Sequence, residues 1–157
     1  MQGTYEFMSD ELLEATELGV PYLQSPVDDL FSLYYTMQWA AVFHHREFAD
    51  DKDIPPRLRA LRKEVSGSTP LRNSATHRIT VPEELDSRQY GQFLVDCHPF
   101  MRDWYSSLAS LRNIWKKSQS RLELEGQDRP GVYPSLFPIF AVQGVAQLAE
   151  LVEKYTM

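Results

Sequence analysis

The sequence predicts a mainly helical protein, and three observations support this fold class. Apolar residues recur every three or four positions through several long segments, which is the spacing of one helix face. Prolines and glycines fall between these segments, where they end one helix and begin the next. Only the short stretch 77–81, HRITV, has the composition of extended structure. We therefore expect an all-α fold, or one very close to it.

The first two expected helices lie within residues 9–45. The stretch SDELLEATEL, residues 9–18, predicts a short helix for which Ser9 or Asp10 can serve as the N-cap. The loop GVPYLQSP then interrupts the pattern with one glycine and two prolines. A second helix is expected from about 28 to 45, and it is apolar almost all round. Such a helix is typically buried at the centre of a domain.

A third helix and a loop are expected next. The polar stretch REFADDKDIPP follows the second helix, and Pro55 or Pro56 can begin a helix that continues through Val65. Gly67 marks the end of this helix. Residues 66–77, SGSTPLRNSATH, predict a surface loop because their composition is typical of turns.

The C-terminal half predicts three further helical segments. Residues 83–97 have a helical pattern, and Pro99 is expected to open a longer helix. That helix carries regularly spaced apolar residues: Met101, Trp104, Leu108, Leu111 and Trp115. After a turn-rich break at 125–134, a last helix is expected from about 134 to 155. We expect the three tryptophans, Trp39 included, to belong to the core.

Length and composition indicate a single domain. The chain has 157 residues, 43% of them hydrophobic and 24% charged, which is enough for one well-packed core. The net charge of −6 is opposite in sign to the basic surface that nucleic-acid binding needs. The single cysteine, Cys97, leaves no intrachain disulfide and fits a reducing compartment.

The sequence also predicts an intracellular, soluble protein. Its start, MQGTYEFMSDE, lacks the basic and apolar segments of a signal peptide. We expect no apolar stretch of membrane-spanning length, since the nearest to it, residues 30–43, is interrupted by Ser32, Thr36 and Gln38. We therefore expect no membrane and no nucleic acid as partner.

Two motifs in the first part of the chain resemble a protein kinase. Residues 3–11, GTYEFMSDE, are similar to the end of a kinase activation segment, G-T-x-x-[FY]-M-[AS]-P-E, with Asp10 in place of the proline. After a short loop, DDLFSLYY resembles the start of the buried central helix of the kinase C-lobe, D-x-[WF]-S-x-G, with Asp29 in the aspartate position. The form D-D-L-x-S-L-x-Y, followed by an apolar run and Trp39, resembles the fungal-type protein kinase family. The resemblance is strongest over residues 3–43.

The resemblance implies a protein-kinase C-lobe-like helical fragment, a single partial domain over residues 1–157 that lacks the N-lobe and the catalytic loop. Its substrate-loop-like residues would be Gly3, Thr4, Phe7, Met8 and Glu11, and its structural residues would be Asp29, Ser32 and Trp39. In the family, the threonine forms a hydrogen bond with the catalytic aspartate. That aspartate is absent here, so Thr4 is expected to be a solvated turn residue.

Glu11 and Asp29 have more than one possible role. In the family, the glutamate pairs with a buried arginine further along the chain, for which Arg88 or Arg102 is available here. A solvated glutamate at the start of a helix is an equally good interpretation of Glu11. Without a catalytic loop to bind, Asp29 is expected to cap its helix.

No catalytic residue is predicted. In a kinase, the glycine-rich loop, the strand lysine, H-R-D and D-F-G precede this region. This sequence contains no G-x-G-x-x-G, no V-A-I-K-like strand and no D-F-G. His45-Arg46-Glu47 only superficially resembles H-R-D, because it follows the activation-segment motif instead of preceding it. The chain is therefore expected to lack phosphotransfer activity on its own, as a pseudokinase-like piece. ATP and Mg²⁺ would be cofactors only if upstream kinase sequence completed the domain.

No metal site and no basic binding surface are expected either. His44-His45 and Cys97-His98 are adjacent pairs, and neighbouring side chains on a helix point about 100° apart. Neither pair has the spacing of a zinc site. The basic patches at 57–63 and 112–121 are expected to be solvated helix faces.

Three functional hypotheses remain open. The preferred one is a fungal-type kinase C-lobe fragment without activity, and the second is the C-lobe part of an active serine/threonine kinase completed by upstream sequence. The third is an unrelated helical interaction module with kinase-like motifs by chance. If the central helix has lost its kinase neighbours, the uncovered surface predicts self-association or a protein partner.

Overall fold

The computed structural model describes residues 5–124 and 132–157, and these ranges contain helices and no strand. The mainly helical fold class is therefore confirmed. Two short 3-10 helices and seven α-helices follow one another in the described ranges: η1 (Tyr5–Phe7), α1 (Asp10–Leu18), α2 (Pro26–Val42), η2 (Asp51–Asp53), α3 (Pro56–Val65), α4 (Thr69–Ile79), α5 (Ser87–Tyr90), α6 (Gln92–Leu124) and α7 (Val132–Thr156).

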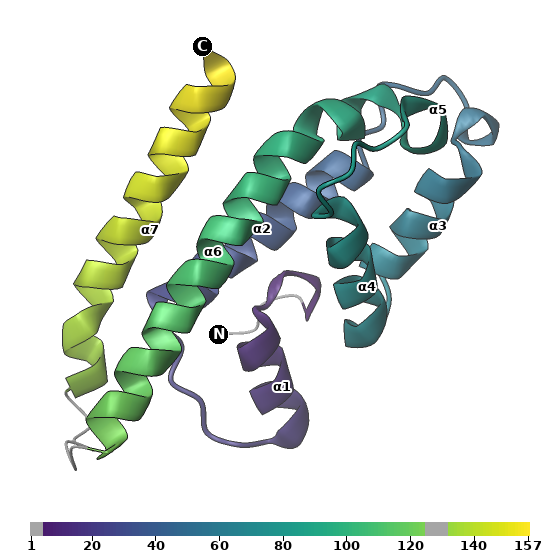
Figure 1. Cartoon of the computed structure of the whole chain (residues 1–157). Helices are drawn as coiled ribbons and strands as arrows, with labels where there is room; N and C mark the ends of the chain where they lie inside the picture. Colours follow the sequence, from purple (N-terminus) through teal and green to yellow (C-terminus); the bar gives the residue numbers. More distant parts are fainter. Residues whose placement is uncertain (1–4, 125–131) are drawn as a thin grey trace.

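Helix α2 is the centre of the core, as its composition predicts. Phe31, Tyr34 and Val42 are at most 1% exposed, and α2 packs on α6, α7, η1 and α3. Figure 1 shows α6 and α7 side by side, with α2 crossing behind α6 and the shorter helices α3 to α5 gathered at one end of α6. Of the large apolar side chains of α2, only that of Leu33 is about half exposed. The expected buried central helix is thus present.

The start of α2 differs from the expectation that Asp29 caps it. Ser25 is the N-cap, Pro26 begins the helix, and Asp28 completes a reciprocal capping box with Ser25. The side chain of Asp29 is solvent-exposed and accepts a hydrogen bond from Gln24 Nε2 at 2.5 Å. The capping prediction for Asp29 is therefore wrong, because Ser25 is the N-cap and Asp28 completes the capping box.

The predicted loop at 66–77 is also wrong, because most of it forms α4. Pro70 lies in the first turn of this helix, where its missing N–H costs nothing. Ala75 and Ile79 lie four residues apart and are completely buried. The turn-like composition concealed this apolar spacing. Residues 77–79 complete the same helix, so the hint of extended structure at 77–81 is wrong as well.

Helix α6 begins earlier than expected, and Pro99 lies inside it. Its first backbone N–H groups, those of Gln92 and Phe93, donate to the carboxylate of Glu47. Gly91 precedes them with φ 82°, and a side chain there would also collide with Glu47. Glu47, the last residue of the H-R-D-like triplet, therefore caps a helix.

The segment predicted as helical at 83–97 is helical in two parts. Residues 87–90 form α5 and residues 92–97 belong to α6, while residues 83–86 are not helical. The turn-rich break predicted at 125–134 lies mainly outside the described residues, and α7 already begins at Val132.

Helix α7 covers one flank of the core and leaves its other face open. Gly144 lies so close to α2 that a Cβ atom there would be 2.1 Å from Leu30 Cδ1. At the C-terminal end, Asp103 of α6 accepts hydrogen bonds from Lys154 Nζ at 2.8 Å and from the Tyr155 hydroxyl at 2.6 Å. On the opposite face, four aliphatic side chains are 44–69% exposed: Ile139, Val142, Val145 and Val152.

The apolar character of this helix corrects one sequence-based prediction. The stretch Pro134–Thr156 is long and apolar enough to cross a membrane, with a mean hydropathy of 1.5, and only 11% of its apolar window is buried. The expectation that no stretch of the chain has such a length is therefore wrong. Length and composition alone support this statement.

Candidate functional site

The most elaborate polar cluster forms around Arg72, a charged residue of α4 whose side chain is only 3% exposed. Its Nη1 atom donates to the backbone carbonyls of Tyr5 at 3.2 Å, Glu6 at 3.4 Å and Met8 at 2.9 Å. A guanidinium group has donors in a planar fork, which suits the simultaneous binding of several oxygen atoms. Arg72 therefore holds the backbone of residues 5–8 against α4.

The same guanidinium group forms an ion pair with Asp10, the first residue of α1. Nη2 of Arg72 lies 2.6 Å from Asp10 Oδ1, and the guanidinium carbon lies 4.2 Å from the centre of the Tyr35 ring. The Tyr35 hydroxyl donates to the same carboxylate oxygen at 3.2 Å. Burial, together with the negative charge of Asp10, raises the pKa of Tyr35, so its hydroxyl keeps its proton. We call Arg72, Asp10, Tyr35 and the backbone of residues 5–8 the Arg72 cluster.

Asp28 joins the start of α1 to the start of α2. Its buried carboxylate accepts hydrogen bonds from Ser9 Oγ at 2.5 Å, from the Tyr22 hydroxyl at 3.0 Å and from Ser25 N at 2.7 Å and Ser25 Oγ at 2.9 Å. Burial raises the pKa of Tyr22, and the charge of Asp28 acts in the same direction. These hydrogen bonds satisfy the buried carboxylate of Asp28 and hold the two helix starts in one orientation.

Glu11 finds its basic partners on α6. Lys116 Nζ lies 2.7 Å and Arg112 Nη1 lies 3.6 Å from Glu11 Oε1. Burial by itself would raise the pKa of Glu11, but the Lys116 hydrogen bond and the Arg112 charge outweigh it, so the pKa is lowered. Of the two arginines considered from the sequence, Arg102 pairs with its neighbour Asp103 at 3.1 Å. Glu11 is therefore not a solvated residue, and its arginine partner is the partly buried Arg112 of α6, not Arg88 or Arg102.

The other substrate-loop-like residues lie in or near the Arg72 cluster. Gly3 and Thr4 lie outside the described residues. Met8 contributes its carbonyl to Arg72, and the ring of Phe7 packs edge-to-face on Trp39 with 5.8 Å between ring centres. The structure thus brings Phe7, Met8 and the helix bearing Trp39 together.

The three residues predicted as structural have different environments. Trp39 is only partly buried, and it stacks on Phe43 with 4.3 Å between ring centres. The backbone carbonyl of Ser32 accepts a hydrogen bond from Thr36 Oγ1 at 2.9 Å. Asp29 faces solvent, as described above. Of the three tryptophans, Trp104 and Trp115 are in the core, so the prediction for Trp39 is only partly correct.

Sequence reasoning missed Arg72, Asp10 and Asp28 as the charged residues that organise this region. For Asp28 the signal was present, because Ser25-Pro26 followed by Asp28 is a helix-start pattern with a capping box. For Arg72 the helical spacing of Ala75 and Ile79 was a signal that its segment is a helix. That spacing does not reveal its partners.

The contacts of Arg72, Asp28 and Glu11 hold the N-terminal segment against the helices. Two small cavities of about 140 Å³ and 70 Å³ flank the Arg72 cluster and the Glu11 pairs. Across residues 5–124 and 132–157, no group of three or more His, Cys, Asp or Glu side chains is arranged to hold a metal ion. The chemistry on view is hydrogen bonding and ion pairing between segment 5–11 and helices α2, α4 and α6.

Comparison with known proteins does not extend this picture. No protein-family model, no curated protein and no solved structure matches the chain. The resemblance of residues 3–43 to the fungal-type protein kinase family therefore rests on the two sequence motifs and stays a prediction.

Proposed function

We propose that this chain is a fungal-type protein-kinase C-lobe-like domain that does not transfer phosphate on its own and that acts as a protein-interaction module. The observation that carries the proposal is the Arg72 cluster. The resemblance implies a buried arginine, further along the chain, that pairs with Glu11 and braces the substrate loop. The buried Arg72 supports this comparison, although it pairs with Asp10, the neighbour of Glu11.

The order of the helices supports the same proposal. A short helix, α1, is followed by a loop and by the most buried helix, α2, which is the order that the kinase motifs imply. Two details depart from the family pattern. Asp10 stands where the family has proline and pairs with the arginine in place of Glu11, and Asp29 is exposed on the surface.

The alternative is that the chain is the C-lobe part of an active serine/threonine kinase. The gene sequence directly upstream of Met1 distinguishes the two proposals. An in-frame H-R-D and D-F-G there would favour the active kinase, because these motifs supply the catalytic base and the metal-binding aspartate. Their absence would favour the interaction module.

The interaction surface of the module would be the outer face of α7. This face carries Ile139, Val142 and Val145, all at least 59% exposed, and residues 134–149 include no charged side chain. Apolar surface of this kind marks association sites in soluble proteins. We propose that a second copy of the chain covers it, because two uncharged helix faces approach each other without electrostatic repulsion.

Sedimentation velocity over a range of protein concentrations tests this association. The wild-type chain is expected to form dimers, and Val142→Asp is expected to sediment as a monomer. Leu18→Asp is the matched control, because Leu18 is 67% exposed on α1, away from this face. A wild-type chain that stays monomeric at high concentration would contradict the dimer, and flotation with lipid vesicles in the same series would point to a membrane as the occupant.

A further inference from the structure

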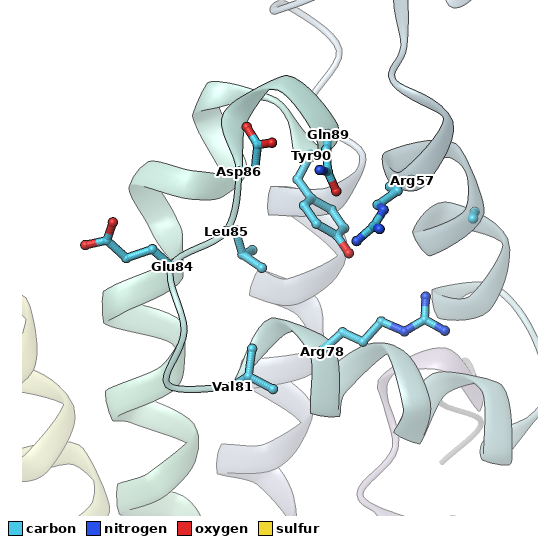
Figure 2. A pocket seen from close by; sticks show the side chains of 9 residues that line it. Arg57, Arg78, Val81, Glu84, Leu85, Asp86, Gln89 and Tyr90 are labelled. Atoms are coloured by element: carbon cyan, nitrogen blue, oxygen red, sulfur yellow. The ribbon is translucent and has the colours of Figure 1, made fainter.

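A second feature of the molecule lies apart from the Arg72 cluster. A cavity of about 550 Å³ opens between α3, the end of α4 and residues 81–90 (Figure 2). This volume falls in the range of small-ligand sites, roughly 300–1,000 Å³. No part of the proposed function uses this cavity.

Two polar groups at the cavity have no partner of their own. The guanidinium of Arg57 forms no hydrogen bond or ion pair with any residue in the described ranges, and neither does the hydroxyl of Tyr90. Tyr90 is only 9% exposed, so its ring is fixed in the wall while its hydroxyl stays open to a ligand. Figure 2 shows the Tyr90 hydroxyl and the Arg57 guanidinium directed toward the same space.

The remaining charged groups at the cavity are already engaged or point elsewhere. Arg78 is paired with Glu64 at 2.9 Å, and the carboxylate of Asp86 accepts the backbone N–H of Arg88 at 2.9 Å. Figure 2 shows Glu84 pointing away from the arginines. The Asp86 carboxylate keeps its negative charge, so among the described residues that line the cavity Arg57, an exposed residue, is the cation without an ion pair, and it lies beside the Tyr90 hydroxyl.

The rest of the cavity wall is mainly aliphatic, with the polar side chain of Gln89 beside Tyr90. Ala60, Val81 and Leu85 line it together with the Tyr90 ring. Ligand sites commonly combine such an apolar wall with a few polar groups that fix orientation. A ligand that matches these features has one negative charge at one end and an apolar body at the other.

We propose that this cavity binds a carboxylate carried on an apolar body. The Arg57 guanidinium pairs with the carboxylate through two parallel N–H···O bonds, and the Tyr90 hydroxyl donates a third. The apolar body lies against Val81 and Leu85. A monoanionic carboxylate matches the single free guanidinium, whereas a doubly charged phosphate would leave one charge uncompensated. The carboxylate belongs either to a free organic acid or to the C-terminus of a peptide ending in an apolar residue.

Backbone amide NMR of the full chain, titrated with 3-phenylpropionate, tests the proposal. The expected dissociation constant is on the order of 1 mM, as for a small ligand with few contacts. Chemical-shift changes are expected at Ala60, Val81 and Tyr90. The neutral 3-phenylpropanamide has the same body without the charge and is expected to bind at least about tenfold more weakly. Equal binding of the amide, or shift changes confined to other regions, would overturn the proposal.

Two variants and a control locate the polar groups. Arg57→Gln is expected to weaken 3-phenylpropionate binding about tenfold or more, and Tyr90→Phe by several-fold, because each removes a donor to the carboxylate. Arg88→Gln is the control, since Arg88 is exposed on the neighbouring α5 and its side chain does not line the cavity. Loss of binding in the control alone, or an unchanged affinity in Arg57→Gln, would overturn the assignment.

Two peptide arms identify the source of the carboxylate. The tripeptide Gly-Gly-Leu with a free C-terminus is compared with its amidated form and with 3-phenylpropionate. Tighter binding of the free tripeptide than of 3-phenylpropionate would assign the site to a peptide C-terminus. Tighter binding of 3-phenylpropionate would assign it to free organic acids.

Discussion

Arg72 is the residue on which the N-terminal segment depends. A buried charge is tolerated because it is paired, and removal of one partner leaves the other uncompensated in a medium of low polarity. Replacing Arg72 would leave the carbonyls of Tyr5 and Met8 without their donor, and Asp10 with only the Tyr35 hydroxyl at 3.2 Å and Arg112 at 3.8 Å. The segment and α1 would then lose their attachment to α4.

We expect Arg72→Met to lower the free energy of unfolding by about 3–5 kcal/mol, measured by urea denaturation. The matched control is Arg78→Met on the same helix, because the Arg78 side chain is 46% exposed whereas that of Arg72 is 3% exposed. Arg78→Met is expected to lower the free energy of unfolding by no more than about 1 kcal/mol. Similar small losses in both variants would mean that the Arg72 cluster is not a stabilising centre.

The tryptophans offer a second test at the scale of single residues. Trp104 is 2% exposed and packs edge-to-face on Tyr34, whereas Trp39 is only partly buried. Trp104→Ala is expected to cost about 3–5 kcal/mol, as for large aromatic truncations in cores. Trp39→Ala is expected to cost clearly less, since part of its side chain already faces water. Chemical denaturation that ranks the two in the opposite order would contradict this description of the core.

Among the helices, the contact between α7 and α2 depends on Gly144. A Cβ atom at this position would collide with the Leu30 side chain, so a larger residue must displace that buried side chain or push the helices apart. We expect Gly144→Val to lower the free energy of unfolding by about 1–3 kcal/mol. Ala146→Val places the same side chain at an exposed position of α7 and is expected to change stability by less than about 1 kcal/mol. Equal effects of both variants would argue against this packing.

The C-terminal end of α7 is expected to respond to acid. The hydrogen bonds from Lys154 and Tyr155 lower the pKa of Asp103 from 3.8 to about 2. Because the folded-state pKa is the lower one, this contribution to stability is complete above pH 4 and is lost as the pH falls toward 2. Asp103→Asn should therefore be less stable than wild type at pH 6, with a smaller difference at pH 2. A difference that is the same at both pH values would show that the Asp103 carboxylate contributes no such stability.

Helices with strong end signals were the predictable part of the fold. The start of α3 at Pro56 and the ranges of α1 and α7 follow from prolines, glycines and apolar spacing. Helix α4 was not predictable by composition, since two of its buried residues, Arg72 and Thr76, are polar. Similarly, Pro99 reads as a helix start, although the Glu47 carboxylate begins α6 before it.

The candidate site was less predictable than the helices. The motif at 3–11 directed attention to the correct segment, but the residues that hold it come from elsewhere in the chain. Arg72 lies 62 positions after Asp10, and nothing local in the sequence connects them. Ion pairs between residues far apart in the sequence depend on how the helices pack. A local motif therefore identifies one member of such a pair and not its partner.

For the molecule as a whole, α7 serves both as a cover and as a surface. Deletion of residues 134–157 would uncover the flank of α2 around Leu30 and the face of α6 that carries Trp115. We expect the truncated chain to bind more of a dye for exposed apolar surface and to aggregate. A truncated chain that stays monomeric, unfolds cooperatively and does not bind the dye would show that α7 covers no essential surface.

The central claim is a kinase-like domain without phosphotransfer of its own, and calorimetric titration with Mg²⁺-ATP tests it most directly. Nucleotide phosphates need a cradle of backbone N–H groups and metal-holding carboxylates, and the sequence carries neither motif. An active protein kinase titrated under the same conditions serves as the positive control. We predict no saturable heat for this chain. Stoichiometric binding with a micromolar dissociation constant would contradict the claim.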